Sequence, residues 1–216
     1  MRALFFGPPG SGKGTQAAAL AGRRGLPHVS SGDLLRAAQR AGTPLGRQAA
    51  AYMERGALVP DPLVLDLLLE RLASPDCGRG FLLDGFPRNL PQAKALEGRL
   101  SRAGRAALDR ALRFLLSDEA VLERLSGRRS CKGCGTPYHV RFHPPRVEGR
   151  CDRCGGELLA RPDDAPSVVR ERLAVHRRDE EDLVEFYRRQ EILKEVEARG
   201  TVEEVAGRVE AALGGG

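Results

Sequence analysis

A glycine-rich loop near the N-terminus lies between a short apolar run and a segment of helical character. Residues 7–15 read Gly-Pro-Pro-Gly-Ser-Gly-Lys-Gly-Thr and follow the apolar run 3–6. Glycines let backbone N–H groups turn inward around phosphate oxygens, and the following helix points its positive end at the same anion. The lysine can reach the outer phosphates, and the hydroxyl can hold Mg²⁺. The predicted phosphate-binding residues are Gly10, Ser11, Gly12, Lys13, Gly14 and Thr15.

The loop departs at one position from the simplest form of this motif. Gly14 separates Lys13 from Thr15, where a serine or threonine usually follows the lysine directly. The alternative interpretation is a glycine-rich turn that binds nothing. We favour the phosphate loop, because the turn lies between a strand signal and a helix signal, as the motif requires.

The rest of the chain alternates apolar runs with helical patterns. We expect strands at 2–6, 27–30, 81–84 and 111–116, and helices at 14–23, 34–41 (capped by Ser31 or Asp33), 44–54, 62–72, 90–104, 118–125, 167–199 and from 202 onward. This alternation predicts an α/β fold in three layers, with helices on both faces of a central parallel sheet. The segments 31–60 and 127–164 look like excursions from that core.

The charge balance narrows the class of partner without choosing one. The chain has 35 Lys and Arg against 29 Asp and Glu, a formal net charge of +6, which suits nucleic acid, membrane phosphates or small phosphorylated substrates. The N-terminus enters a strand directly, which is not typical of a signal peptide, and no apolar run approaches the ~20 residues of a membrane span. We therefore expect a cytoplasmic protein with no membrane partner.

Four of the five cysteines form a C-x2-C-x16-C-x2-C pattern: Cys131, Cys134, Cys151 and Cys154. Two such pairs can supply a tetrahedral all-sulfur site with Zn–S distances of about 2.3 Å, and thiolates select zinc, with iron a possible substitute. Unligated cysteines or two disulfides are the alternatives, and a cytosolic setting disfavours them. Because all four ligand positions are filled, the metal should be structural and should hold a small β-rich module. Cys77 has no partner at ligand spacing.

Acidic and basic residues gather where the sheet should end. Asp84 closes the strand 81–84, and Arg88 follows in the sequence Asp-Gly-Phe-Pro-Arg. Ligands of α/β sheets bind outside the carboxyl ends of the strands, where Asp84 could orient Mg²⁺ waters and Arg88 could grip phosphate. Further arginines that suit phosphoryl transfer bracket the cysteine module: Arg124, Arg128, Arg161, Arg170 and Arg172. For Arg170 and Arg172, a solvated basic helix face is an equally good interpretation.

Together, the segments GPPGSGKGT, SSGDLLR and LLDGFPRN-x-x-Q and the arginine-flanked cysteine module resemble the bacterial adenylate kinases of the long-lid, zinc-bearing type. The resemblance covers nearly the whole chain, and DGFPR with the cysteine module is more specific than the glycine loop. It implies a P-loop core (1–29, 60–126 and 165–216), a helical domain that binds the nucleoside monophosphate (30–59) and a zinc lid (127–164). It also implies the Mg²⁺-dependent reaction ATP + AMP ⇌ 2 ADP in a monomer that binds no nucleic acid.

The resemblance further implies the residues of the site. The catalytic set would be Lys13, Arg88, Arg128, Arg161 and Arg172. ATP would contact the glycine loop and also Arg124, Arg128, Pro137, Tyr138 and Gly200. AMP would contact Ser31, Arg36, Ala57, Leu58, Val59, Gly85, Phe86, Pro87, Arg88, Gln92, Arg161 and Arg172. Magnesium would be held through water by Asp33 and Asp84.

The segment before Gly200 is shorter and more charged than is usual in the family, so we expect the last sheet strand to be reduced or missing. Two other functions fit some of the residues. A UMP or CMP kinase would share the core motifs but usually has a short lid without four cysteines. A zinc-ribbon ATPase that binds nucleic acid would fit the basic charge, but it would not explain DGFPR.

Overall fold

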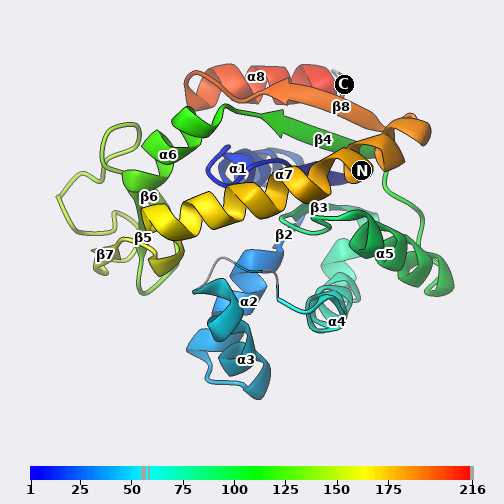
Figure 1. Cartoon of the computed structure of the whole chain (residues 1–216), viewed down its shortest axis with the longest axis horizontal. Helices are drawn as coiled ribbons and strands as arrows, with labels where there is room; N and C mark the ends of the chain where they lie inside the picture. Colours follow the sequence, from blue (N-terminus) through cyan, green and yellow to red (C-terminus); the bar gives the residue numbers. More distant parts are fainter. Residues whose placement is uncertain (55–56, 58, 215–216) are drawn as a thin grey trace.

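A five-stranded parallel sheet forms the centre of the molecule. The computed structural model describes residues 1–54, 57 and 59–214. The sheet has the strand order β2-β3-β1-β4-β8, and its strands are β1 (Arg2–Phe6), β2 (His28–Ser30), β3 (Phe81–Asp84), β4 (Arg110–Leu115) and β8 (Leu193–Glu197). Figure 1 shows helices packed on both sides of it. The expected three-layer α/β architecture is confirmed.

The alternation of side chains along β1 explains the three layers. Ala3 and Phe5 point into one apolar cluster with α1 (Lys13–Arg24) and α8 (Val202–Ala212). Leu4 and Phe6 point into a second cluster, on the opposite face of the sheet. Three of the helices that cover this second face are α4 (Asp61–Leu72), α5 (Leu90–Arg102) and α7 (Pro166–Arg189). A parallel strand buried on both faces needs an uninterrupted apolar sequence, which β1 has.

The C-terminal part of the core corrects one expectation. The long helix α7 ends at Arg189 rather than continuing to residue 199, and β8 is a full strand that pairs with β4 from Leu193 to Glu197. The strand lies at the edge of the sheet, and only Val196 among its residues is buried. Its charged residues face solvent, so the sequence lacks the apolar run that marks the other strands.

Two helices leave the core after β2, as expected. The helix α2 (Ser31–Arg40) begins earlier than expected, because the Ser30 side chain, rather than Ser31 or Asp33, caps it by accepting from the Asp33 N–H at 3.3 Å. The next helix, α3 (Pro44–Met53), packs closely on α2. A Cβ atom at Gly46 would lie 2.2 Å from the Ala38 carbonyl oxygen, so this close packing depends on glycine.

The cysteine module is a small antiparallel sheet, as expected. The helix α6 (Asp118–Ser126) leads into β5 (Arg128–Cys131), β6 (Pro137–His139) and β7 (Leu158–Leu159), in the order β6-β5-β7. A short 3-10 helix, η2 (Pro162–Asp164), returns the chain to α7. In Figure 1 the module lies on the left, at the start of α7. Among the described residues, no helix is both long and apolar enough to span a membrane.

Candidate active site

The glycine loop joins β1 to α1 at the carboxyl edge of the sheet. Gly7 has φ of 135°, and a Cβ atom there would lie 2.4 Å from the Phe114 carbonyl oxygen, so only glycine fits beside β4. Gly12, with φ of 89°, is the N-cap of α1. The Lys13 side chain curls back over the loop and donates from Nζ to the carbonyl oxygens of Gly7 (2.9 Å) and Pro8 (2.7 Å).

Asp84 lies directly against this loop. It ends β3 beside Phe5 of β1, and a Cβ atom at Gly14 would come within 3.0 Å of its Oδ2. The departure from the simplest motif at position 14 therefore has a local cause, because the aspartate occupies the space of a side chain. The sequence reasoning missed His28, whose Nε2 lies 3.4 Å from the same Oδ2.

The charges around Lys13 leave it in a strongly cationic environment. The pKa of Lys13 is lowered to about 8, mainly because burial removes it from bulk water; the nearby Asp84 carboxylate opposes this shift, and the arginines at 88, 172 and 128 add to it. Burial, together with Arg172, lowers the pKa of Arg88 to about 10. Several positive charges held close together without equal compensation favour an anionic ligand.

The loop after β3 fixes the position of Arg88. Its Nε donates to the Gly85 carbonyl oxygen at 2.6 Å, and its backbone N–H donates to Gln92 Oε1 at 2.7 Å. The other end of the Gln92 amide donates to Asp61 Oδ1 at 2.6 Å, which links α5 to α4. Asn89 caps α5 by accepting from the Gln92 N–H at 2.9 Å. Gln92, which holds the backbone of Arg88, is thus itself fixed by hydrogen bonds to Asn89 and Asp61.

A pocket beside Arg88 collects most of the residues expected to bind AMP. Those that line it are Ser31, Arg36, Ala57, Val59, Gly85, Phe86, Arg88, Gln92 and Arg172. Pro87 lines a neighbouring pocket together with Lys13. Arg161 lines neither of these two pockets, and Leu58 lies outside the described residues. Sequence reasoning missed the apolar wall formed by Leu35, Met53 and Val64.

Two carboxylates of the short helix η2, at the end of the cysteine module, contact the expected catalytic arginines. Arg128 makes a bidentate ion pair with Asp164, with Nε 2.7 Å from Oδ2. Arg172 donates to Asp163 Oδ2 at 3.0 Å. Arg161 donates from Nε to Ser130 Oγ at 2.6 Å, and burial with the nearby arginines lowers its pKa to about 10. Sequence reasoning missed both carboxylates.

Exposure separates the two arginines of α7 that the sequence left open. Arg170 is exposed, whereas Arg172 lines both pockets. Exposure thus distinguishes two arginines that the sequence pattern treats alike.

Asp33 was expected to hold magnesium through water. Its Oδ1 lies 2.6 Å from the Arg36 guanidinium.

Arg124 connects the glycine loop to the segment that follows β8. It donates to the carbonyl oxygens of Ala198 (2.8 Å), Gly200 (3.4 Å) and Ser11 (3.4 Å). Three of the residues expected to contact ATP, Ser11, Arg124 and Gly200, therefore lie together. Tyr138 differs, because its side chain is only 5% exposed and packs inside the cysteine module.

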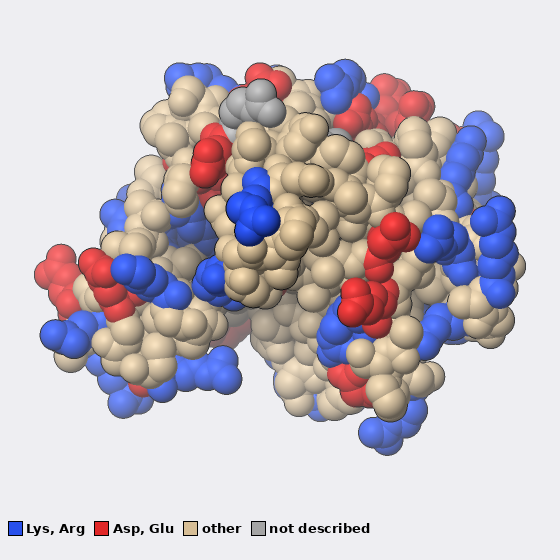
Figure 2. Space-filling view, turned by 90° about the horizontal axis from the view of Figure 1, so that it is seen from below, with Lys and Arg blue, Asp and Glu red and all other residues tan. Residues whose placement is uncertain are grey.

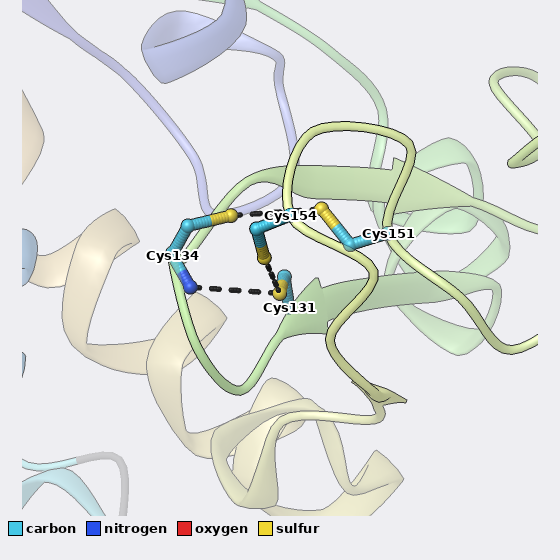
Figure 3. A group of neighbouring side chains, drawn as sticks. All are labelled: Cys131, Cys134, Cys151 and Cys154. Atoms are coloured by element: carbon cyan, nitrogen blue, oxygen red, sulfur yellow. Dashed lines mark hydrogen bonds between the residues drawn. The ribbon is translucent and has the colours of Figure 1, made fainter.

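The four cysteines converge as their spacing predicts (Figure 3). All four Sγ atoms lie within 4.8 Å of one another, close to the S–S separation of about 3.8 Å that a tetrahedral zinc site requires. A Cβ atom at Gly156 would lie 3.0 Å from the Cys131 Sγ and 3.3 Å from the Cys154 Sγ, so glycine keeps this space open. The donor set fits zinc. Cys77 is buried in the main core, apart from this cluster.

Comparison with known proteins identifies the family of the chain. The adenylate kinase family model matches residues 5–192. The chain is 51% identical to an adenylate kinase of Thermodesulfovibrio yellowstonii, in an alignment that covers 95% of each chain. It is 48% identical to one of Salinispora tropica, over 99% of this chain and 98% of the relative. It is 46% identical to one of Carboxydothermus hydrogenoformans, over 99% of each chain. With its phosphate loop, arginine cluster and four-cysteine module in place, the chain belongs to the adenylate kinase family.

Proposed function

We propose that Lys13, Arg88, Arg128, Arg161 and Arg172 surround the phosphoryl group during the family's reaction, ATP + AMP ⇌ 2 ADP. The observation that carries this proposal is that Lys13, Arg88 and Arg172 line one pocket. Burial is the main cause that lowers the pKa values of Lys13 and Arg88, and the charge of Arg172 lowers both further. Such a group of desolvated cations is costly in the free protein and is stabilised by a polyphosphate. It would be most useful where negative charge shifts between two nucleotides.

The reaction needs no side chain as a base. The AMP phosphate is already a nucleophile near neutral pH, so the protein must align it with the γ-phosphate of ATP and keep water out. Arg88 would hold one phosphate from a fixed position, because Gly85 and Gln92 orient it. Lys13 would exchange its contacts with the Gly7 and Pro8 carbonyl oxygens for phosphate oxygens.

The pocket beside Arg88 would take AMP, with Arg36 and Arg172 toward the phosphate and the apolar wall toward the base. Residues 30–59 would form the domain that binds the monophosphate. The contacts expected of residues 57–59 include Leu58, which lies outside the described residues. ATP would lie along residues 10–15 and reach toward Arg124 and Gly200. The core would comprise residues 1–29, 60–126 and 165–216.

Residues 127–164 would act as the lid. In this structure, Asp163 and Asp164 hold Arg172 and Arg128, and phosphate oxygens would replace these carboxylates when nucleotides bind. Exchange of one anionic partner for another would keep Arg128 and Arg172 paired with an anion in both states. Pro137 and Tyr138 would meet ATP through their backbone, since the Tyr138 ring is buried inside the module.

Two metals fit the residues present. Magnesium would neutralise charge on the ATP phosphates, held by Thr15 and, through water, by Asp84 and Asp33. Zinc would be held by Cys131, Cys134, Cys151 and Cys154 and would stabilise the lid without touching substrate. We further propose that the protein works as a cytoplasmic monomer on ATP, AMP and ADP, with no nucleic-acid partner.

A coupled assay of ADP formation tests the proposal. Purified protein with Mg²⁺ and ATP should form two ADP per AMP consumed, and CMP, UMP and GMP should be much poorer acceptors. Equal rates with CMP or UMP would contradict the proposed AMP pocket. ATP hydrolysis that needs RNA and ignores AMP would contradict the reaction itself.

A further inference from the structure

The first turn of α1 contains a buried glutamine to which the proposed chemistry gives no role. Gln16 directly follows Thr15 and is 3% exposed. Its Nε2 donates to the Val202 carbonyl oxygen at 2.8 Å, across 186 residues of sequence. Since a carbonyl oxygen can only accept, this bond fixes which way the amide faces. No donor among the described residues reaches the buried Oε1 atom of Gln16, so the amide is held by its single bond to Val202.

The bond joins α1 to the segment 197–202, which connects β8 to α8. Arg208 holds this segment from the other side, because its Nη1 donates to the carbonyl oxygens of Glu197 (2.8 Å) and Arg199 (2.6 Å). Thr201 then caps α8 in a reciprocal capping box. The segment is therefore fixed by side chains from both neighbouring helices.

Gly200 lies in the middle of this segment. Its φ is 106°, and a Cβ atom there would lie 2.1 Å from Glu204 Oε2, so the position is built around glycine. Its carbonyl oxygen accepts one long hydrogen bond of 3.4 Å from Arg124 and is otherwise exposed with the rest of the residue. A carbonyl oxygen has two lone pairs, so one acceptor site remains for a ligand.

We propose that Gln16 is a positioning residue that sets the selectivity of the enzyme for the base of its phosphate donor. The proposal rests on the proposed function, in which ATP reaches toward Gly200, and it takes the Gly200 carbonyl oxygen as the group that meets the base of ATP. Gln16 connects the helix whose N-terminus binds the phosphates to the segment that meets the base. The distance from phosphate to base in a nucleotide is limited, so a rigid connection between these two parts selects donors that fit both.

The chemistry of the bases explains the expected selectivity. Adenine presents an amino group, which donates to a carbonyl oxygen, whereas guanine presents a carbonyl oxygen at the same place, which is repelled. The repulsion discriminates only if the Gly200 carbonyl cannot turn away. Loss of the Gln16 bond would remove the side-chain hydrogen bond that joins α1 to the start of α8 and let the segment shift.

The test replaces the amide with apolar groups of similar length, in Gln16→Leu and Gln16→Met, and measures KM and kcat for ATP, GTP and AMP. We expect KM for ATP to rise on the order of fivefold or more, the worth of one buried hydrogen bond. We expect the preference for ATP over GTP to fall, with KM for AMP unchanged. The matched control is Gln190→Leu, whose amide contacts Glu97 at the surface, and it should leave all these values unchanged.

Several outcomes would overturn the proposal. An unchanged KM for ATP and an unchanged ATP/GTP preference in a folded Gln16 variant would do so, as would a parallel rise in KM for ATP and AMP. Arg208→Leu removes hydrogen bonds to the same segment without changing α1, so it should also raise KM for ATP and lower the preference for ATP over GTP. A variant in which only KM for AMP changes would contradict the proposal. If the wild-type protein forms no ADP from ATP and AMP, the proposed function fails instead, independently of Gln16.

Discussion

At position 14 the absence of a side chain has a steric cause. Gly14 faces Asp84 across the start of α1, and a methyl group there would lie 3.0 Å from the Asp84 carboxylate. Gly22 is the matched case on the same helix, since a Cβ atom there meets nothing within 4 Å. Comparing substitutions at these two positions therefore distinguishes an effect on the site from the general effect of glycine on helix stability.

We expect Gly14→Ala to lower kcat at least tenfold, because Asp84 must move from its place beside the phosphate loop. Gly22→Ala should leave kcat unchanged and stabilise the protein by about 0.5–1 kcal/mol, as alanine favours helix. Steady-state kinetics and thermal unfolding of both variants would test this. A normal kcat in Gly14→Ala would mean that the exact place of Asp84 does not matter to the reaction.

The lowered pKa of Lys13 predicts a specific dependence on pH. A lysine whose pKa falls to about 8 is charged below that pH and loses its charge as the pH rises through it. Bound triphosphate would raise this pKa again, so kcat/KM for ATP should decline above about pH 8 while kcat is maintained to higher pH.

Profiles of kcat/KM and kcat against pH would test this prediction. In Lys13→Arg the guanidinium stays charged throughout the range, so the decline near pH 8 should disappear from the remaining activity. A wild-type kcat/KM that stays level to about pH 10, the range of an ordinary lysine, would show that Lys13 keeps its charge in the free enzyme.

At the scale of elements, local patterns in the sequence predicted what is local in the structure. The glycine loop and the cysteine pattern each lie within one segment of the chain. The place of the loop between β1 and α1 and the convergence of the four cysteines were predicted correctly. The strand β8 was missed because its burial depends on its place at the sheet edge, where only Val196 needs to be apolar. The Arg128–Asp164 pair was missed for a similar reason, since the two residues are 36 positions apart and meet only through the fold of the module.

The helix α7 carries a buried group that sequence patterns give no reason to notice. Tyr187 is fully buried between the sheet and α5, and its hydroxyl has no partner among the residues described. An unpaired buried hydroxyl costs about 1–3 kcal/mol. Tyr187→Phe should therefore raise the melting temperature by several degrees and leave kcat unchanged. A lower melting temperature would mean that the hydroxyl makes a hydrogen bond in solution.

At the scale of the whole molecule, charge does not gather into one platform on the face shown in Figure 2. Lys and Arg side chains lie beside Asp and Glu over much of this face. The net charge of +6 therefore does not correspond to a single basic platform on this face. The functionally informative cations are instead those withdrawn into the cleft, where burial and mutual repulsion lower their pKa values.

The core and the cysteine module differ greatly in how many apolar side chains they bury. The core has two large apolar clusters, one on each face of the sheet, whereas the cysteine module has one cluster of four residues: Cys131, Tyr138, Cys151 and Leu158. Its larger apolar side chains Val140, Phe142 and Val147 are more than half exposed. A cluster of this size cannot stabilise the module by apolar burial alone. The metal would therefore supply most of the stability of the module.

This difference predicts how the protein responds to a zinc chelator. Chelation should lower the melting temperature by several degrees and introduce an early transition for the lid, while activity measured in the cold declines much less. Calorimetry and the ADP assay on the same samples, with added zinc to restore the loss, would test this. Cys134→Ser, at an exposed ligand position, should behave like the chelated protein and should not respond to zinc. Immediate loss of activity in the cold, in step with metal removal and before any change in melting, would place the metal at the reaction centre instead.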